Sequence, residues 1–180
     1  MFKVIKEVGS TRVFKYLVFE IWGLVFRCLL YSPLRILWLK LGGAKLGDNC
    51  FIDGASFMNL DRTGLSGLTL GNDCYIGPEV IIDLAGKVTL KKQTTIAARA
   101  IILSHNSVGY SDHPLIKYYP KKTYHTIIGP GSVIGVNGII LPGVTVGAGT
   151  LVAAGSVVTK SLPDGVMVAG SPAVIKKTLA

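Results

Sequence analysis

The stretch IGPGSVIGVNGIILPGVTVGAGTLVAAGSVVTKSLP, residues 128–163, repeats with a period of six. The first position of each unit is aliphatic and β-branched: Ile128, Ile134, Ile140, Val146, Val152 and Val158. The fifth position is small: Ser132, Gly138, Val144, Thr150 and Ser156. A fixed period of this kind is typical of a repeat architecture in which each unit buries its apolar residues against its neighbours.

The same period continues upstream in two further registers. One register contains Leu46, Ile52, Leu70, Ile76 and Ile82, and the other contains Leu90, Ile96 and Ile102. The slip of two residues between Ile82 and Leu90 predicts a bulged corner within the repeat. Cys50 and Cys74 occupy the small fifth position, so we interpret them as core residues, not as nucleophiles or metal ligands.

The segment before residue 44 is built differently. It holds eight of the 15 aromatic residues and seven of the 19 Lys and Arg, against two acidic residues. Arg12–Leu30 forms an amphipathic helix with a wide apolar face when placed at about 100° per residue. Charged residues interrupt its apolar run, which disfavours a membrane-spanning helix. Ser32-Pro33 begins a second short helix that ends at Gly42-Gly43.

Two interpretations of these helices stay open. They pack on the rest of the protein or at a subunit contact, or they lie on a membrane surface, where basic and aromatic residues suit the headgroup region. In the second case residues 1–40 hold the protein on the cytoplasmic inner face of the plasma membrane. We therefore divide the chain into an amphipathic segment, residues 1–43, and a repeat domain, residues 44–180.

The composition excludes other classes. With 49% hydrophobic residues the chain is too apolar to be disordered. The three cysteines form no CxxC pair, which argues against a disulfide scaffold or a zinc ribbon. The net charge of +9 does not indicate nucleic acid binding, because much of the excess lies beside aromatic residues and no recognition motif is present.

The repeat, together with ILPGVTVGAGTLVAAGSVVTKSLPDGVMVAGSPAVIKK at residues 140–177, resembles the hexapeptide-repeat acyltransferases. The resemblance is to their sugar O-acetyltransferase branch, which includes maltose, galactoside and colanic acid acetyltransferases. It implies an all-β fold, a left-handed parallel β-helix with three hexapeptides per coil, assembled as a homotrimer. We further expect the N-terminal amphipathic helices, an extruded loop at residues 103–127, and a short C-terminal helix in a tail at residues 164–180.

The loop at residues 103–127 carries the main functional signal. The six-residue frame is lost there, and the loop holds all three histidines of the chain. Stacked side chains fill a β-helix, so chemistry has to come from such loops or from grooves between subunits. Histidine is the side chain best suited to moving a proton at neutral pH.

Three interpretations of these histidines compete. A zinc site resembling that of the γ-class carbonic anhydrases needs histidines on rigid coil faces, but His113 lies in mid-loop, so we expect no metal. A histidine without catalytic function is the interpretation we favour for His125. The third interpretation is a general base. In the resembled family this base lies at the start of the loop, which favours His105, with His113 as the rival because His113-Pro114 resembles a His-Pro dipeptide found in some members.

The resemblance also implies a mechanism and a co-substrate. Neutral His105 takes a proton from an acceptor hydroxyl, which attacks the thioester of acetyl-CoA directly, and a main-chain N–H near Val136 of the adjacent subunit stabilises the oxyanion. The residues that match the family's coenzyme A contacts are Gly135, Ala154, Thr159, Lys160 and Lys177. The small residues allow close approach to the pantetheine arm, and the lysines attract phosphate.

The acceptor is less determined by the sequence. The predicted acceptor contacts are Asp83, Asn106, Tyr110 and Tyr118. The group that orients His105 stays open, since Asp83, Asp112 or a backbone carbonyl would serve. The predicted function is O-acetylation of a sugar hydroxyl in a polysaccharide or a lipid-linked glycan precursor. The alternatives are N-acetylation of an amino sugar and a non-catalytic trimeric scaffold.

Overall fold

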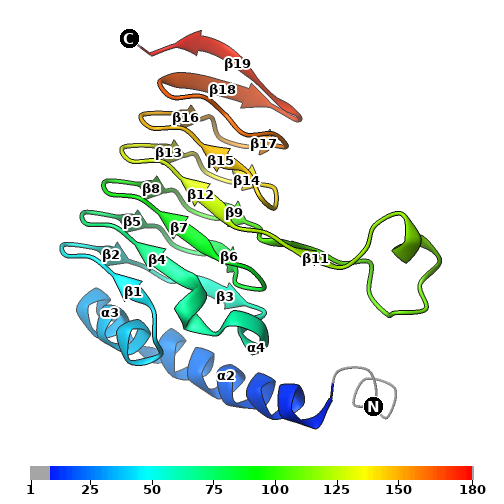
Figure 1. Ribbon diagram of the computed structural model, residues 1–180. Coiled ribbons are helices and arrows are strands. Elements are labelled where there is room, and N and C mark those ends of the chain that lie inside the picture. Colours follow the sequence, from blue (N-terminus) through cyan, green and yellow to red (C-terminus); the bar gives the residue numbers. More distant parts are fainter. Residues whose placement is uncertain (1–8, 180) are drawn as a thin grey trace.

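The computed structural model describes residues 9–179, so the part of the amphipathic segment at residues 1–8 lies outside it. Residues 45–158 wind through five stacked coils, and each coil contributes one short strand to each of three parallel sheets (Figure 1). The fold is the predicted left-handed parallel β-helix, with helices beneath its first coil and one long arm extending from its side.

The strands follow the order of the coils. The first sheet contains β1 (Lys45–Leu46), β4 (Leu68–Leu70), β7 (Val88–Leu90), β12 (Thr126–Ile128) and β15 (Thr145–Val146). The second contains β2 (Phe51–Ile52), β5 (Tyr75–Ile76), β8 (Thr95–Ile96), β13 (Val133–Ile134), β16 (Leu151–Val152), β18 (Val166–Gly170) and β19 (Ala173–Thr178). The third contains β3 (Ser56–Met58), β6 (Ile81–Asp83), β9 (Ile101–Ile102), β14 (Ile139–Ile140) and β17 (Val157–Val158).

The aliphatic frame read from the sequence forms the core. Every frame residue from Ile52 to Val158 lies on a strand of its own and has at most 3% of its surface exposed. Ile96 pairs in register with Ile76 on one side and with Ile134 on the other, so the frame residues stack in columns. Burial of such a side chain stabilises a fold by about 1.5–3 kcal/mol, which makes these columns the main source of stability.

The small fifth positions tie one coil to the next. Ser132 Oγ donates a hydrogen bond to the Gly147 carbonyl at 2.6 Å, and Cys74 Sγ donates to the Lys91 carbonyl at 3.0 Å. Burial raises the pKa of the Cys74 thiol, which disfavours the reactive thiolate. The interpretation of Cys74 as a core residue is confirmed, and Cys50 is half-buried at the same corner one coil earlier.

The frame is interrupted where the sequence indicated. The two additional residues between β6 and β7 lie in a corner in which Leu84 and Ala85 are buried, as expected for a bulge within the repeat. The stretch after Ile52, which the frame does not describe, contains β3, the helix α4 (Leu60–Thr63) and the 3-10 turn η1 (Leu65–Gly67).

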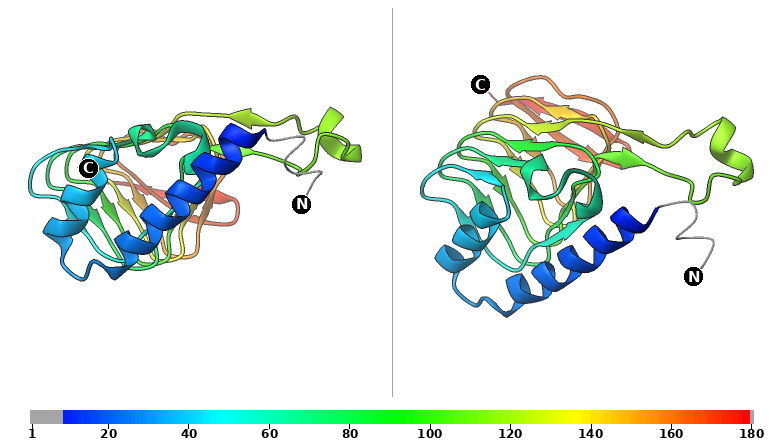
Figure 2. Two further views of the ribbon diagram at one scale, coloured as in Figure 1. Left: turned by 90° about the horizontal axis from the view of Figure 1, so that it is seen from below. Right: turned by 60° about the horizontal axis from the view of Figure 1, so that its bottom comes forward.

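The helices α2 (Ser10–Cys28) and α3 (Ser32–Leu41) lie beneath the first coil (Figure 2). Trp22 of α2 stacks on Trp38 of α3 with ring centroids 4.1 Å apart, and Phe26 meets Phe57 of β3 edge-on at 5.5 Å. Phe19 packs against the same core. One side of α2 is therefore part of the protein interior.

The other side of α2 is apolar and exposed. The large apolar residues with 42% to 90% of their surface exposed are Phe14, Leu17, Val18, Ile21 and Leu24 on α2 and Leu30, Leu34, Leu37 and Leu41 on or before α3. We call this set the apolar face. Within residues 9–179, no helix combines the length and the hydropathy that crossing a bilayer requires.

The prediction of a short C-terminal helix is wrong. The tail forms a hairpin in which β18 pairs in parallel with β16 and antiparallel with β19. Val166 and Val168 are buried, and this alternation of β-branched residues suits a strand better than a helix. Gly170, at φ 106°, and Pro172 form the turn, and both residues are unfavourable within a helix.

The predicted extruded loop forms the arm. It leaves the third coil as β10 (His105–Asn106), carries the turn η2 (Pro114–Lys117) near its tip, and returns as β11 (Lys122–Thr123). The strands β10 and β11 pair antiparallel, with His105 opposite Thr123. The arm projects away from the column of coils (Figure 1).

Truncation of one frame residue tests the role of the core columns. We expect Ile134→Ala to lower the free energy of unfolding by about 2–5 kcal/mol, because it leaves a cavity in the coil. Val133→Ala is the matched control, because Val133 is only half-buried on the outer side of the same strand. Denaturant unfolding of both variants is the measurement, and equal losses would contradict this account of the core.

Candidate active site

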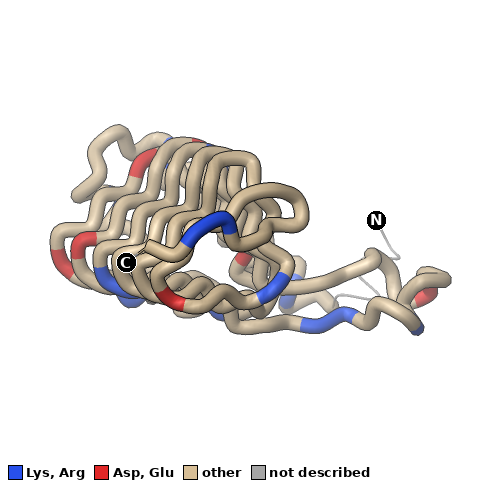
Figure 3. The backbone as a smooth tube through the Cα atoms, turned by 90° about the horizontal axis from the view of Figure 1, so that it is seen from above, with Lys and Arg blue, Asp and Glu red and all other residues tan. Residues whose placement is uncertain are grey.

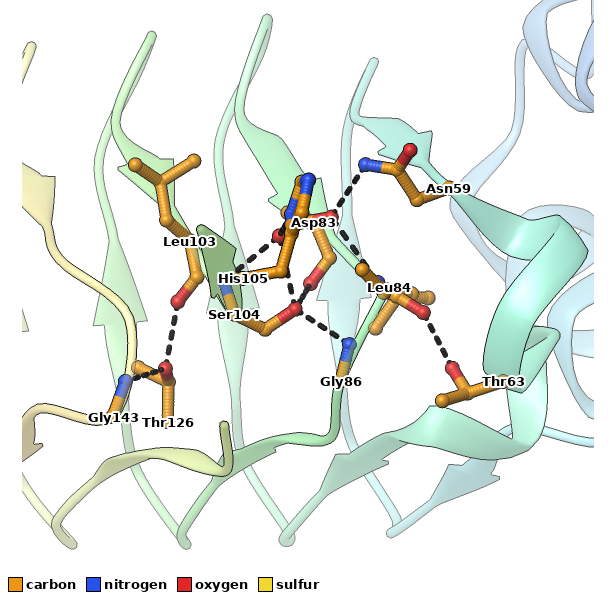
Figure 4. Close-up of polar contacts among 11 residues, drawn as sticks. Asn59, Thr63, Asp83, Leu84, Gly86, Leu103, Ser104, His105, Thr126 and Gly143 are labelled. Atoms are coloured by element: carbon orange, nitrogen blue, oxygen red, sulfur yellow. Dashed lines mark hydrogen bonds and ion pairs between the residues drawn. The ribbon is translucent and has the colours of Figure 1, made fainter. Parts of the chain in front are cut away.

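His105 lies where the arm leaves the third coil. Ile102, at the end of β9, is fully buried and fixes the backbone just before the histidine. Thr123 pairs with His105 across the arm, and Thr126 Oγ1 donates a hydrogen bond to the Leu103 carbonyl at 2.6 Å (Figure 4). These contacts hold the outgoing and returning segments of the arm together at its base, next to His105.

The imidazole of His105 is bonded to a buried carboxylate. His105 Nδ1 lies 2.6 Å from Asp83 Oδ2, and Asp83 stands at the end of β6, one coil below (Figure 4). The side chain of Asp83 is fully buried, whereas 19% of the His105 side chain is exposed. One ring nitrogen is therefore held in the protein interior while part of the ring faces solvent.

Both oxygens of Asp83 accept further hydrogen bonds. Oδ2 accepts from the backbone N–H of Ser104 at 2.9 Å, and Oδ1 accepts from Asn59 Nδ2 at 2.7 Å and from the Ala85 N–H at 3.1 Å. Burial alone raises the pKa of Asp83, but these donors and His105 outweigh it and hold the pKa below its ordinary value. Asp83 is therefore a carboxylate at neutral pH.

The charge on Asp83 determines the tautomer of His105. A carboxylate only accepts hydrogen bonds, so His105 Nδ1 carries the proton in this contact. In the neutral ring Nε2 then has a free electron pair and can take a proton from a hydroxyl group. A buried acid plays the same part in serine proteases, where it fixes the tautomer and orientation of the catalytic histidine.

The other two histidines have different surroundings. His113 lies near the tip of the arm. It caps the start of η2, where its Nδ1 accepts a hydrogen bond from the Leu115 N–H at 3.1 Å. His125 is exposed, and its Nε2 lies 2.8 Å from Thr89 Oγ1. The structure thus separates the three side chains along the arm.

Three of the residues predicted on the coenzyme A side meet at one corner. Gly135, Val136 and Ala154 lie on adjacent coils between the second and third sheets. A Cβ atom on Gly135 would lie 2.6 Å from the Ala154 nitrogen, so close packing of the coils itself requires glycine there. Val136 has 38% of its surface exposed, and Ala154 is exposed as well.

The remaining predicted coenzyme A residues lie elsewhere. Thr159 and Lys160 are exposed after β17, at the end of the third sheet from which the arm also leaves. Lys177 is exposed on β19. Figure 3, which views the protein from above, shows basic positions at the C-terminal end of the column and along the arm. A single chain therefore does not bring the whole predicted set together.

The predicted acceptor residues also lie in two different places, the arm and the interior of the coil. Asn106, Tyr110 and Tyr118 are exposed on the arm. Asp83 has no exposed surface, and both of its oxygens accept hydrogen bonds, one of them in the contact with His105. Its contact with the acceptor stays a prediction, whereas its contact with His105 is the one expected of a residue that orients the ring.

No pattern in the sequence marks Asn59. It lies in the stretch without a hexapeptide frame and adopts a left-handed conformation, φ 58°, which asparagine tolerates better than most residues. Ser104 is not predicted either, although a small polar residue directly before the predicted base could have indicated a hydrogen-bonding partner in the site.

Comparison with known proteins agrees with this fold. The family described as the hexapeptide repeat of succinyl-transferase matches residues 125–160. An Escherichia coli K12 protein named as a colanic acid biosynthesis acetyltransferase, WcaF, is 32% identical over 78% of this chain and 72% of its own length. WbbJ from the same strain, named as a lipopolysaccharide biosynthesis O-acetyl transferase, is 31% identical over 76% of this chain and 72% of its own length.

A solved structure shares the whole fold. A galactoside acetyltransferase in complex with coenzyme A superposes with a TM-score of 0.80 at 22% identity, covering 100% of this chain and 91% of that protein. Together with the sequence relatives, this shows that the chain belongs to the hexapeptide-repeat acetyltransferases. It is an enzyme of the sugar-acetyltransferase type.

Substitution of Asp83 tests its charge. We expect Asp83→Asn to lower the free energy of unfolding at pH 7 by about 1–3 kcal/mol, because an amide hydrogen must then face the N–H of Ser104 or of Ala85. The pKa of Asp83 is lowered in the folded state from an unfolded value of about 3.9. The stabilisation is therefore present above that value and is lost as pH falls through the folded pKa.

The measurement is denaturant unfolding of both proteins between pH 7 and pH 3. The difference in stability between wild type and Asp83→Asn is expected to narrow at the acid end. Asp48→Asn, at an exposed position, is the control and should change stability little at any pH. A difference that stays constant over this range would contradict a stabilising charge on Asp83.

Proposed function

We propose that this protein is an acetyl-CoA-dependent O-acetyltransferase that modifies a sugar hydroxyl, with His105 as general base. The observation that carries the proposal is the contact between His105 and the buried, ionised Asp83. This contact leaves Nε2 as a proton acceptor at the start of the arm. The biosynthetic roles in the names of WcaF and WbbJ support a polysaccharide or a lipid-linked glycan precursor as acceptor.

The proposed reaction is a direct transfer. His105 Nε2 takes the proton of the acceptor hydroxyl while the oxygen attacks the thioester carbonyl carbon. The carbon–sulfur bond then breaks, the protonated His105 returns the proton to the leaving sulfur, and the products are an acetyl ester and free coenzyme A. Asp83 stays ionised throughout and stabilises the imidazolium that forms.

The proposed site needs a second copy of the chain. Strands β9 and β14 pair in register, with Ile102 beside Ile140. His105 follows the end of this pair, and Val136 precedes its start, so the two lie at opposite ends of one face of a single chain. A main-chain N–H near Val136 can therefore serve the oxyanion at His105 only from a neighbouring copy, as in a homotrimer. Lys160 and Lys177 would attract the phosphates of coenzyme A in the same groove.

We also propose that the protein is peripheral on the cytoplasmic face of the plasma membrane. The support is the apolar face of α2 and α3, whose nine large side chains have 42% to 90% of their surface exposed. Lys15, Arg27 and Lys40 are exposed on the same two helices and suit anionic headgroups. A helix that lies in the interface rather than across it has this combination of residues.

Replacement of the proposed base tests the mechanism. We expect His105→Ala to lower kcat for acetyl transfer by about 10²–10⁴-fold, because no other group then takes the hydroxyl proton. Binding of coenzyme A, measured by titration calorimetry, and the oligomeric state should stay unchanged. The control is His113→Ala, for which we expect a kcat close to that of the wild type. Wild-type turnover in His105→Ala, or loss of turnover in His113→Ala alone, would overturn the assignment of the base.

Charge placed on the apolar face tests the membrane proposal. Leu17→Asp should weaken binding to anionic lipid vesicles by about tenfold or more, because a leucine side chain contributes about 1.5–3 kcal/mol when it leaves water. Ile175→Asp is the matched control, since Ile175 is 53% exposed and Leu17 is 55% exposed. Vesicle co-sedimentation measures both, and equal behaviour of the two variants would count against a membrane role for α2.

A further inference from the structure

A cavity of about 380 Å³ lies between the start of α3 and β2, on the outer side of the second sheet. This volume falls within the range of roughly 300–1,000 Å³ that is typical of pockets for small molecules. Its lining includes the aromatic rings of Tyr31 and Phe51 and the charged groups of Arg35 and Asp53. The cavity therefore combines flat apolar surfaces with hydrogen-bonding groups.

This cavity faces away from the candidate active site. Each coil passes through the first, second and third sheets in turn, and the arm that carries His105 leaves between the third sheet and the first. The second sheet is therefore the side of the coil opposite His105, and Figure 1 shows its strands and the arm on opposite sides of the column. The proposed homotrimer uses the third-sheet face between His105 and Val136, so the cavity lies on a different face.

A stacked pair of aromatic rings supports one wall of the cavity. Phe51 on β2 and Tyr75 on β5 pair in register, and their rings stack with centroids 5.5 Å apart and an angle of 5° between the planes. Tyr75 thus covers one face of the Phe51 ring. The opposite face is left for the cavity, because β2 is the end strand of this sheet and no further strand lies below it. Phe51 has 48% of its surface exposed.

A buried arginine holds a carboxylate at the edge of the cavity. Arg35 is 8% exposed, and its Nε donates a hydrogen bond to the Leu29 carbonyl at 2.6 Å. Its Nη1 donates to the Ile52 carbonyl at 3.3 Å and to Asp53 Oδ1 at 3.1 Å, and Oδ1 also accepts from the Gly54 N–H at 2.9 Å. Within residues 9–179, Asp53 Oδ2 and Arg35 Nη2 have no hydrogen-bond partner. One fixed acceptor and one fixed donor are therefore available to a ligand.

The charges of the lining favour a neutral ligand. The guanidinium of Arg35 and the carboxylate of Asp53 form an ion pair, with Nη1 3.1 Å from Oδ1, and their charges cancel. A small anion in the cavity would meet Asp53, and a small cation would meet Arg35. A neutral molecule with hydroxyl groups meets no such penalty, because a hydroxyl group both donates and accepts hydrogen bonds.

We propose that this cavity is a second glycan-binding site, in which one sugar ring of an oligosaccharide lies against Phe51. The apolar C–H face of a pyranose would cover the free face of the Phe51 ring, and aromatic side chains bring large contact areas. Sugar hydroxyls would donate to Asp53 Oδ2 and accept from Arg35 Nη2. The inference goes beyond the proposed function, because the site takes part in no step of the acetyl transfer.

Binding of defined sugars to a fluorescent variant tests the proposal. Methyl β-glycosides of glucose, galactose, mannose and N-acetylglucosamine are titrated into full-length Phe51→Trp, which keeps an aromatic face in the cavity. We expect a saturable shift of the tryptophan emission to shorter wavelength with at least one glycoside, because the sugar ring removes the indole from water. Sorbitol, which has hydroxyl groups but no pyranose ring, and tetramethylammonium, a cation without hydroxyl groups, should give no saturable shift.

Three further variants locate the binding, with affinities measured by ligand-observed NMR titration. Phe51→Leu should weaken the glycoside about three- to tenfold, because leucine is apolar but has no flat face. Asp53→Asn should weaken it about tenfold, because the charged acceptor is lost while Oδ1 can still accept from Arg35. Tyr118→Leu is the matched control, since Tyr118 is an exposed ring on the arm and a predicted acceptor contact. A glycoside held at the acceptor site would respond to Tyr118→Leu, and one held in this cavity would not.

The outcomes separate this site from the proposed function. Absence of a saturable shift with all four glycosides, a shift with sorbitol or tetramethylammonium, or weakening by Tyr118→Leu in place of Phe51→Leu would overturn the site. Binding is measured without acetyl-CoA and should persist in His105→Ala. Binding as expected, with no acetyl transfer in the wild type, would overturn the enzymatic proposal and leave this site standing.

Discussion

Aliphatic side chains recur at every sixth residue, and each stacks on its counterpart in the neighbouring coil. The rest of the structure depends on this contact. Ile96 lies between Ile76 and Ile134 and has no exposed surface. An interior packed in this way has no room for a substrate. Function therefore lies in the parts that leave the coil, and the rigid column determines where they leave. His105 comes three residues after Ile102, the last buried frame residue before the arm.

The same stacking brings together His105 and Asp83. Asp83 ends β6 and pairs with Met58 of the coil below, which Asn59 directly follows. Ser104 comes two residues after Ile102, which pairs with Ile82 of β6. The coil register therefore brings Asn59 and Ser104 toward Asp83 from the two neighbouring coils. A buried carboxylate is costly unless donors surround it, and Asp83 receives them from three coils at once. The charge that fixes the tautomer of His105 is thus maintained by donors on the neighbouring coils together with His105 itself.

Periodicity explains what the sequence could predict. The frame residues identify the coil because a filled β-helix tolerates little besides aliphatic residues at those positions, and the loss of the frame marks the arm that contains His105. Asp83 follows an inward residue, so its position in the pattern faces outward. It is nevertheless buried, in contact with Asn59 and His105, which lie 24 and 22 residues away along the chain. Period alone does not reveal such side-chain contacts. The pattern does not predict the tail hairpin, because the strands of the hairpin no longer follow the period of six.

The helix α2 is apolar on two sides, and packing on the first coil accounts for one of them. Phe19, Trp22 and Phe26 pack on the first coil, while the residues of the apolar face point the other way. Apolar residues on both sides account for the wide apolar face in the sequence, and in the proposed membrane role the exposed side is the one that meets the lipid. Glu20 and Arg27 lie at one edge between the two apolar sides, where they border a cavity of about 260 Å³ that Asn59 also lines. Lys15 differs from them, because it is exposed on the side of α2 that faces α4.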